Sequence, residues 1–190
     1  FALMPRMTSA QSLPPCSTGR IVNSGALTLS NCVIDGNTTT GSGGGVENYG
    51  TLDLINVVVS NNHGAVGGGI YNSGTLTLTN VTITGNVSDG IGGGLFNDHG
   101  AVFMDDVSIT GNRSQAGGGG LANIGGALIG SRIAVIANET VAGDGGGILN
   151  DASLCLSAGT DFNACFDAHP DGQREYTALY TCDQQRTCAS

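Results

Sequence analysis

The sequence predicts an all-β fold: a right-handed parallel β-helix of about six coils of 24–27 residues, followed by a disulfide-stapled C-terminal cap. Three observations predict it. A short motif recurs along most of the chain, a block of constant length lies inside each repeat, and apolar residues alternate with polar ones within that block.

The recurring motif is a glycine run followed by an aliphatic residue, any residue and asparagine. Its first full copy is Gly43-Gly44-Gly45-Val46-Glu47-Asn48, and an earlier copy without the glycines ends at Asn23. The closing asparagines of all copies are Asn23, Asn48, Asn72, Asn97, Asn123 and Asn150. The steps between them are 25, 24, 25, 26 and 27 residues. A period of this length indicates a stacked repeat architecture.

The block inside each repeat does not vary in length. The distance from its first apolar residue to a later asparagine is ten residues in every copy: Leu27 to Asn37, Leu52 to Asn62, Leu76 to Asn86, Val102 to Asn112, and Leu128 to Asn138. One residue inserted into a strand would turn every following side chain to the opposite face. A fixed block between loops of variable length is therefore typical of stacked strands.

Alternation within the block predicts two strands and a corner. Leu76 and Leu78 share one face, Val81 and Ile83 share one face, and the phase breaks at Asn80. The aliphatic-x-Asn unit after the glycines supplies a third, shorter strand. Three strands in about 25 residues form one coil, which rises by about 4.8 Å, and parallel crossovers favour the right hand.

Alignment of the repeats predicts which side chains stack. The inward columns are Leu27, Leu52, Leu76, Val102, Leu128 and Leu154, and Ile34, Val59, Ile83, Ile109 and Val135. Cys32 shares a column with Val57, Val81, Val107 and Ile133, which predicts that it is buried. At the corner we expect an asparagine ladder of Asn31, Asn56 and Asn80 that breaks where Asp106 and Arg132 follow.

Composition excludes several classes of function. The chain has 190 residues, enough for one domain, a net charge of −9, and six basic residues that are all arginine. It therefore has no lysine for phosphate-loop or Schiff-base chemistry, and its charge argues against nucleic-acid binding. No apolar run approaches the ~20 residues of a membrane helix. Six cysteines favour an oxidising compartment, so we expect an extracellular or cell-surface location.

The motifs resemble those of bacterial cell-surface β-helix repeat proteins, including the repeats of chlamydial polymorphic outer-membrane proteins. Gly67-Gly68-Gly69-Ile70 is similar to that family's Gly-Gly-Ala-aliphatic motif, and Ile34-x-x-Asn37 is similar to its Phe-x-x-Asn motif. The second motif recurs as Val59-x-x-Asn62, Ile83-x-x-Asn86, Ile109-x-x-Asn112 and Val135-x-x-Asn138. The resemblance covers residues 20–157 and implies surface display, adhesion or a passenger role. It transfers no catalytic residue, because the motifs contain none.

Departures from the repeat divide the chain into an N-terminal arm or cap at 1–19, the β-helix at 20–157 and a C-terminal cap rich in cysteine and aromatic residues at 158–190. Within the cap, residues 173–182 fit a short helix. Cys155 should point outward from the last coil and anchor the tail. The candidates for structural disulfides are Cys16, Cys32, Cys155, Cys165, Cys182 and Cys188, whose pairing the sequence leaves open.

Five apolar residues fall at outward positions: Tyr71, Phe96, Phe103, Ile129 and Leu149. Two interpretations stand. The C-terminal tail folds back over them, which we favour, or they form an interaction patch for a partner or for bundling.

Polar candidates are sparse. The variable loops carry His63, Asp89, Arg113, Glu139 and Asp144 without an aromatic residue, which fits solvated turns better than a sugar-binding cleft. Asp105-Asp106 is the only adjacent carboxylate pair, but neighbours on a strand face opposite ways. We therefore expect no catalytic, cofactor-binding or metal site.

Sequons for N-glycosylation occur at Asn37, Asn80, Asn86, Asn112 and Asn138. Four of the five share one repeat column, so the periodicity explains them better than glycosylation does.

These observations favour a non-enzymatic extracellular structural or adhesive module, with self-association end to end into fibres as one variant. Its expected partners are a second copy or a cell-surface carbohydrate. The alternative is a polysaccharide lyase or glycoside hydrolase on the same scaffold, which rests on analogy of fold alone.

Overall fold

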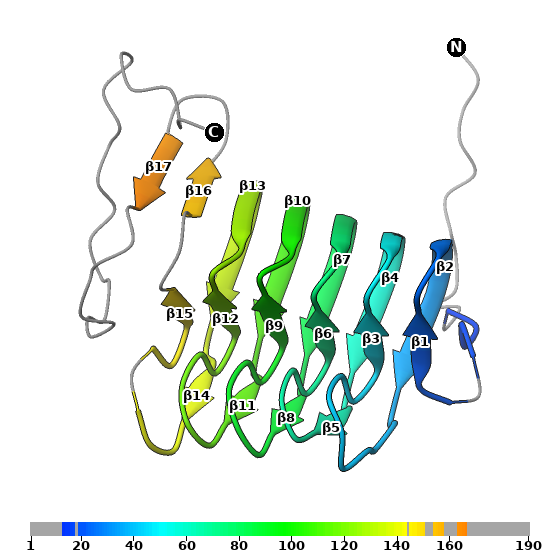
Figure 1. The fold of residues 1–190 in the computed structure, drawn as a ribbon, viewed down its shortest axis with the longest axis horizontal. Helices are drawn as coiled ribbons and strands as arrows, with labels where there is room; N and C mark the ends of the chain where they lie inside the picture. The colour runs from blue at the N-terminus through cyan, green and yellow to red at the C-terminus, as the bar shows by residue number, and fades with distance from the viewer. Residues whose placement is uncertain (1–12, 18, 144, 151–153, 158–162, 167–190) are drawn as a thin grey trace, which may run out of the picture.

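The computed structural model describes residues 13–17, 19–143, 145–150, 154–157 and 163–166. These residues form strands without a helix, and the strands stack along one axis in three sheets (Figure 1). All pairs within the stack are parallel. The predicted all-β parallel solenoid is confirmed.

The largest sheet holds the constant block of each repeat. Its ten-residue strands are β2 (Ala26–Asp35), β4 (Thr51–Ser60), β7 (Thr75–Thr84), β10 (Ala101–Thr110) and β13 (Ala127–Ile136). The shorter β16 (Leu154–Ser157) pairs with β13, and β17 (Asn163–Phe166) pairs antiparallel with β16.

Two smaller sheets complete each turn. The aliphatic-x-Asn units form a six-stranded sheet of β1 (Ile21–Asn23), β3 (Val46–Asn48), β6 (Ile70–Asn72), β9 (Leu95–Asp98), β12 (Leu121–Ile124) and β15 (Ile148–Asn150). The loops before the glycines contribute a four-stranded sheet of β5 (His63–Gly64), β8 (Val87–Ser88), β11 (Arg113–Ser114) and β14 (Glu139–Thr140).

Strand register stacks equivalent residues as the repeat predicts. Leu52 pairs with Leu27 on one side and with Leu76 on the other, and the column continues through Val102 and Leu128. Leu52, Leu76 and Val102 are fully buried. The parallel column through Ile34 is also confirmed, and Cys32 is buried above Val57. Apolar burial along these columns is the main source of stability.

The corner ladder is confirmed as well. Asn31, Asn56 and Asn80 adopt left-handed backbone conformations with φ of 56°, 55° and 52°. The Nδ2 group of Asn56 donates to Asn31 Oδ1 at 3.0 Å, and that of Asn80 donates to Asn56 Oδ1 at 2.8 Å. Asp106 and Arg132 keep the left-handed conformation but replace the amide, so the ladder ends at Asn80.

Two further asparagine ladders lie inside the solenoid, and the sequence analysis does not predict them. The closing asparagines of the motif form one, in which each Nδ2 group donates to the next Oδ1 at 2.7–2.8 Å. Asn37, Asn62, Asn86, Asn112 and Asn138 form the other, at 2.9–3.0 Å. Within the described residues, no buried side-chain nitrogen or oxygen lacks a hydrogen-bond partner.

The glycine runs allow neighbouring turns to approach closely. A Cβ atom on Gly68 would lie 2.2 Å from the carbonyl oxygen of Val87, and one on Gly93 would lie 2.3 Å from that of Gly119. Only glycine fits such contacts, which explains why the run recurs in each repeat.

The solenoid has about five full turns, one fewer than the sequence predicts. In the sixth copy of the long strand, β16 has only four residues, and the chain returns antiparallel as β17 because the sequence leaves the repeat there. Cys155 lies opposite Cys165 in this register. Cys182, Cys188 and the helix predicted at 173–182 lie outside the described residues.

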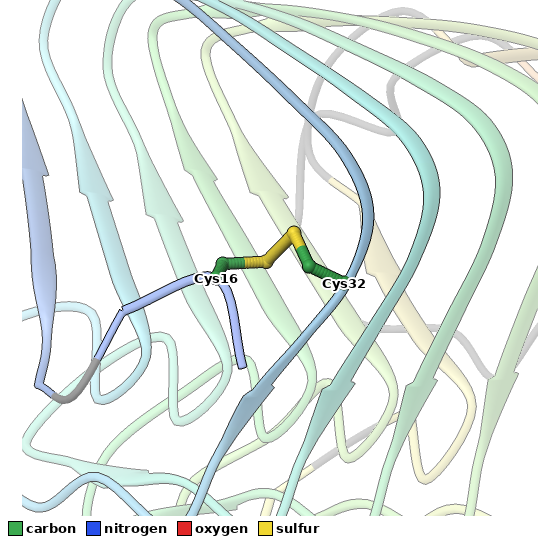
Figure 2. Close-up of a disulfide and its surroundings, with 2 residues drawn as sticks. All are labelled: Cys16 and Cys32. Carbon is green, nitrogen blue, oxygen red and sulfur yellow. A yellow bond between two sulfur atoms is a disulfide. The ribbon is translucent and has the colours of Figure 1, made fainter. Parts of the chain in front are cut away.

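At the other end, Cys16 forms a disulfide with Cys32 (Figure 2). This bond selects one pair among the six candidate cysteines. The boundaries at residues 19 and 157 stay predictions.

Candidate functional site

The outer face of the six-stranded sheet carries side chains that differ from one turn to the next. Its central outward column reads Val22, Glu47, Tyr71, Phe96, Ala122 and Leu149. In every strand of this sheet the residue that follows the outward position in sequence is the closing asparagine of the motif, whose side chain points inward and joins the buried ladder. The inward position is thus fixed by stacking, whereas the outward position is free to serve another purpose.

Three aromatic rings meet on this face, and we call Tyr49, Tyr71 and Phe96 the aromatic row. The ring centroids of Tyr49 and Tyr71 are 6.0 Å apart with an interplanar angle of 57°. Those of Tyr71 and Phe96 are 5.6 Å apart, edge to face at 69°. Both distances lie in the favourable range for aromatic pairs. Tyr49 is 52% exposed and Phe96 only 7%, so the row rises from the sheet toward solvent at Tyr49.

A carboxylate fixes the exposed end of the row. Glu47 Oε1 accepts a hydrogen bond from the Tyr49 hydroxyl at 2.7 Å. Its Oε2 accepts from Arg20 Nη1 at 2.6 Å, and the same nitrogen also donates to the carbonyl oxygen of Ser42. The Glu47 side chain is 13% exposed, so this ion pair is better shielded than a typical surface pair.

A second carboxylate repeats the arrangement two turns along the axis. Asp98 Oδ2 accepts from the Tyr71 hydroxyl at 2.8 Å, and Asp98 Oδ1 lies 2.6 Å from His99 Nδ1. The face therefore holds two similar groups, each a tyrosine hydroxyl and a basic side chain on one carboxylate. We call the aromatic row, together with Arg20, Glu47, Asp98 and His99, the tyrosine–carboxylate face.

The protonation states on this face follow from these contacts. Burial, aided by the hydrogen bond to Asp98, raises the pKa of Tyr71 to about 12. The hydrogen bond to Glu47 raises the pKa of Tyr49. The hydrogen bond from His99 lowers the pKa of Asp98, despite partial desolvation. At neutral pH both hydroxyls keep their protons and Asp98 is ionised, so these groups act as fixed hydrogen-bonding groups.

The five predicted outward apolar residues lie in two columns, one on each of two sheets, as the alignment of the repeats predicts. Tyr71 and Phe96 are in contact, but Phe96 is buried. Leu149 is half-buried and separated from Phe96 by Ala122. Phe103 and Ile129 form the other column, on the seven-stranded sheet, where they are 42% and 49% exposed.

The repeat pattern does not single out five residues of this face: Tyr49, Glu47, Asp98, His99 and Arg20. Tyr49 follows β3 by one residue, so the strand column does not contain it. The clue was available: a tyrosine two residues after Glu47 continues the outward side of the alternation, next to Tyr71 of the following repeat.

The predicted loop residues that the structure describes make pairwise contacts between neighbouring turns. His63 Nε2 lies 2.9 Å from Asp89 Oδ1, and both side chains are largely exposed. Arg113 and Glu139 are neighbours in register on β11 and β14. Asp144 lies outside the described residues. These contacts fit the prediction of solvated turns.

Asp105 and Asp106 have structural contacts rather than forming a paired carboxylate site: Asp105 bonds to the neighbouring turn, and Asp106 forms the corner. Asp105 Oδ2 accepts from Arg132 Nη2 at 2.6 Å, and its Oδ1 accepts from the Ser131 hydroxyl. The hydrogen bond from Ser131 lowers the pKa of Asp105. Asp106 occupies the left-handed corner at φ of 57°.

No group of three or more histidine, cysteine, aspartate or glutamate residues able to hold a metal ion occurs among the described residues. The same residues contain no helix long and apolar enough to cross a membrane. No protein-family model, curated protein or solved structure matches this chain.

Proposed function

We propose that this protein is a non-enzymatic structural or adhesive module of the cell surface or extracellular space, and that it binds carbohydrate through the tyrosine–carboxylate face. The observation that carries the proposal is the pairing of Tyr49 with Glu47 and of Tyr71 with Asp98 on outward positions that the stack does not require.

The chemistry of the face suits a sugar. An exposed ring such as that of Tyr49 offers an apolar surface for the C–H face of a pyranose, and tyrosine buries a large area with few rotatable bonds. Carboxylate oxygens and the arginine and histidine nitrogens beside it can exchange hydrogen bonds with sugar hydroxyls. Sites of this kind combine aromatic contact with a few well-placed polar groups.

Preorganisation strengthens this argument. Both tyrosine hydroxyls and both carboxylates are already held in place by protein contacts at 2.6–2.8 Å. A rigid surface loses little conformational entropy when it binds a ligand. The solenoid beneath is in turn fixed by the buried amide ladders.

The disulfide supports the proposed location. The disulfide between Cys16 and Cys32 joins the segment before the repeat to the first long strand, β2. Such bonds form and persist in oxidising compartments, which include the periplasm, the cell surface and the extracellular space.

A glycan array covering neutral and acidic cell-surface polysaccharides tests the proposal. We expect wild-type protein to bind a subset of glycans, and Tyr49→Ala to reduce binding of that subset at least tenfold. Phe103→Ala, which removes an exposed ring from the seven-stranded sheet, is the matched control and should bind as wild type does. Equal binding by wild type and Tyr49→Ala, or no binding by wild type, would contradict the proposal.

A further inference from the structure

The N-terminal end of the seven-stranded sheet is covered by a three-residue segment. Val33 of β2 donates from its backbone nitrogen to the Pro14 carbonyl oxygen at 2.8 Å and accepts from the Cys16 nitrogen at 2.8 Å. Pro15 thus pairs with Val33 as a parallel bridge. We call residues Pro14 to Cys16 the N-terminal plug.

The disulfide fixes the plug to the core. Cys32 is 7% exposed and occupies the inward column directly above Val57. Cys16 packs against the same apolar cluster, and Figure 2 shows the bond crossing from the plug to β2. The plug therefore stays over the end of the core at the second half of β2.

The outer edge of the plug is poor in donors. Because Pro14 O and Cys16 N face β2, the nitrogen and the oxygen of Pro15 face away from it. Proline has no N–H group, so a further strand would find no donor at this position. Natural sheets use proline in this way to prevent pairing at an exposed edge.

Without the plug, the edge of β2 would match a second copy of this chain. The long strands β2, β4, β7 and β10 pair in one constant register, so β2 presents outward the same backbone pattern that β4 presents to β2. Among the described residues, β16 pairs only with Leu128–Ser131 of β13. The second half of β13 in another copy therefore fits the second half of β2 as one turn of the repeat fits the next.

We infer that the N-terminal plug is an end stop, which prevents the edge of β2 from pairing with the repeat of a second copy. Pro15 removes the outward donor, and the Cys16–Cys32 disulfide keeps the segment in place. At this edge the plug opposes the end-to-end assembly considered from the sequence. The inference is independent of carbohydrate binding.

Two variants remove the stop in different ways. Pro15→Val gives the outer edge of the plug an N–H group, so a further strand can pair with the plug itself, and it leaves the disulfide intact. Cys16→Ser combined with Cys32→Val releases the plug, and valine suits the column because Val57, Val81 and Val107 occupy it in later turns. Pro14→Val is the matched control: it also restores an N–H group, but on the side that faces β2.

Sedimentation velocity over a range of protein concentrations, in high salt to screen the net charge of −9, measures the effect. We expect the weight-average mass of Pro15→Val and of the double variant to rise at least twofold above that of wild type, and Pro14→Val to match wild type. Circular dichroism verifies that each variant is folded. A folded Pro15→Val that sediments as wild type at every concentration, or a Pro14→Val that associates equally, would overturn the inference.

Discussion

The side-chain amide of Asn86 donates a hydrogen bond to Asn112 Oδ1 at 2.9 Å. The bond joins one turn to the next, and both side chains are buried. The same Nδ2 group also donates to the carbonyl oxygen of Val59. In turn, Asn86 Oδ1 accepts from the backbone and side-chain nitrogens of Asn62, each at 3.0 Å. One side chain thus satisfies both its own polar atoms and those of the turn before it.

Replacement of this asparagine should be costly. Asn86→Ala leaves two nitrogens of Asn62 without their acceptor in a buried site, so we expect a loss of about 3 kcal/mol in the free energy of unfolding. Urea denaturation followed by circular dichroism measures it. Asn80→Gly is the control, because it removes an exposed ladder amide and keeps a residue suited to positive φ; we expect it to cost less than about 1 kcal/mol. Equal losses for both variants would contradict the account.

Extension of the exposed corner ladder should stabilise the protein. Asp106 sits at the position that follows Asn80, but a carboxylate cannot donate to Asn80 Oδ1. Asp106→Asn supplies a donor and retains a residue tolerant of the left-handed conformation, so we expect a gain of about 0.5–1 kcal/mol. Thermal unfolding measures this gain. Asp106→Ala, which supplies no donor, should be less stable than wild type, and a gain for alanine would argue against a ladder effect.

The glycine runs should not tolerate a methyl group. In Gly68→Ala the added Cβ would overlap the carbonyl oxygen of Val87, so the adjacent turns must separate. We expect a loss of at least about 2 kcal/mol in the free energy of unfolding. Gly25→Ala is the matched control, since a Cβ there meets nothing within 4 Å, and it should unfold at the same denaturant concentration as wild type. A Gly68→Ala protein as stable as Gly25→Ala would refute the close approach of the turns.

Stability should fall in alkaline solution through Tyr71. Its pKa is raised from 10.0 to about 12, so the folded state holds the phenolic proton more tightly than the unfolded state. This contribution is complete below about pH 10 and is lost as the pH rises through about 12, because the unfolded chain releases the proton first. Urea midpoints at pH 9 and pH 11 measure the loss. Tyr71→Phe should lose less than wild type over this interval; an identical loss would show that Tyr71 does not cause it.

The architecture could be predicted because the repeat constrains both spacing and alternation. Leu52, Leu76 and Val102 recur at one position of a block whose length never changes, and only stacked strands impose both conditions at once. The corner at Asn80 was also visible, since the alternation changes phase there. The sequence predicts about six coils and the structure has about five, because the motif that ends at Asn150 recurs a sixth time whereas the described part of the sixth long strand, β16, has four residues.

The buried ladders and the site were harder to predict for physical reasons. Asparagine is usually exposed, so a repeated asparagine such as Asn72 marks a period without revealing that it is buried. Tyr49 lies in the turn after β3 and contacts Tyr71 in the next coil. An alignment of strand positions places only equivalent residues next to each other, so it does not show this contact. The Cys16–Cys32 pair depends on where residues before the repeat lie, and the repeat does not determine this.

The central claim is that equivalent asparagines stack directly above one another along the axis. Nuclear Overhauser contacts between assigned side-chain amides test it most directly. The account predicts that the Asn72 amide protons show contacts to the amides of both Asn48 and Asn97, each about 25 residues away in sequence. Side-chain amide protons of Asn72 that show contacts only to residues near in sequence would contradict it.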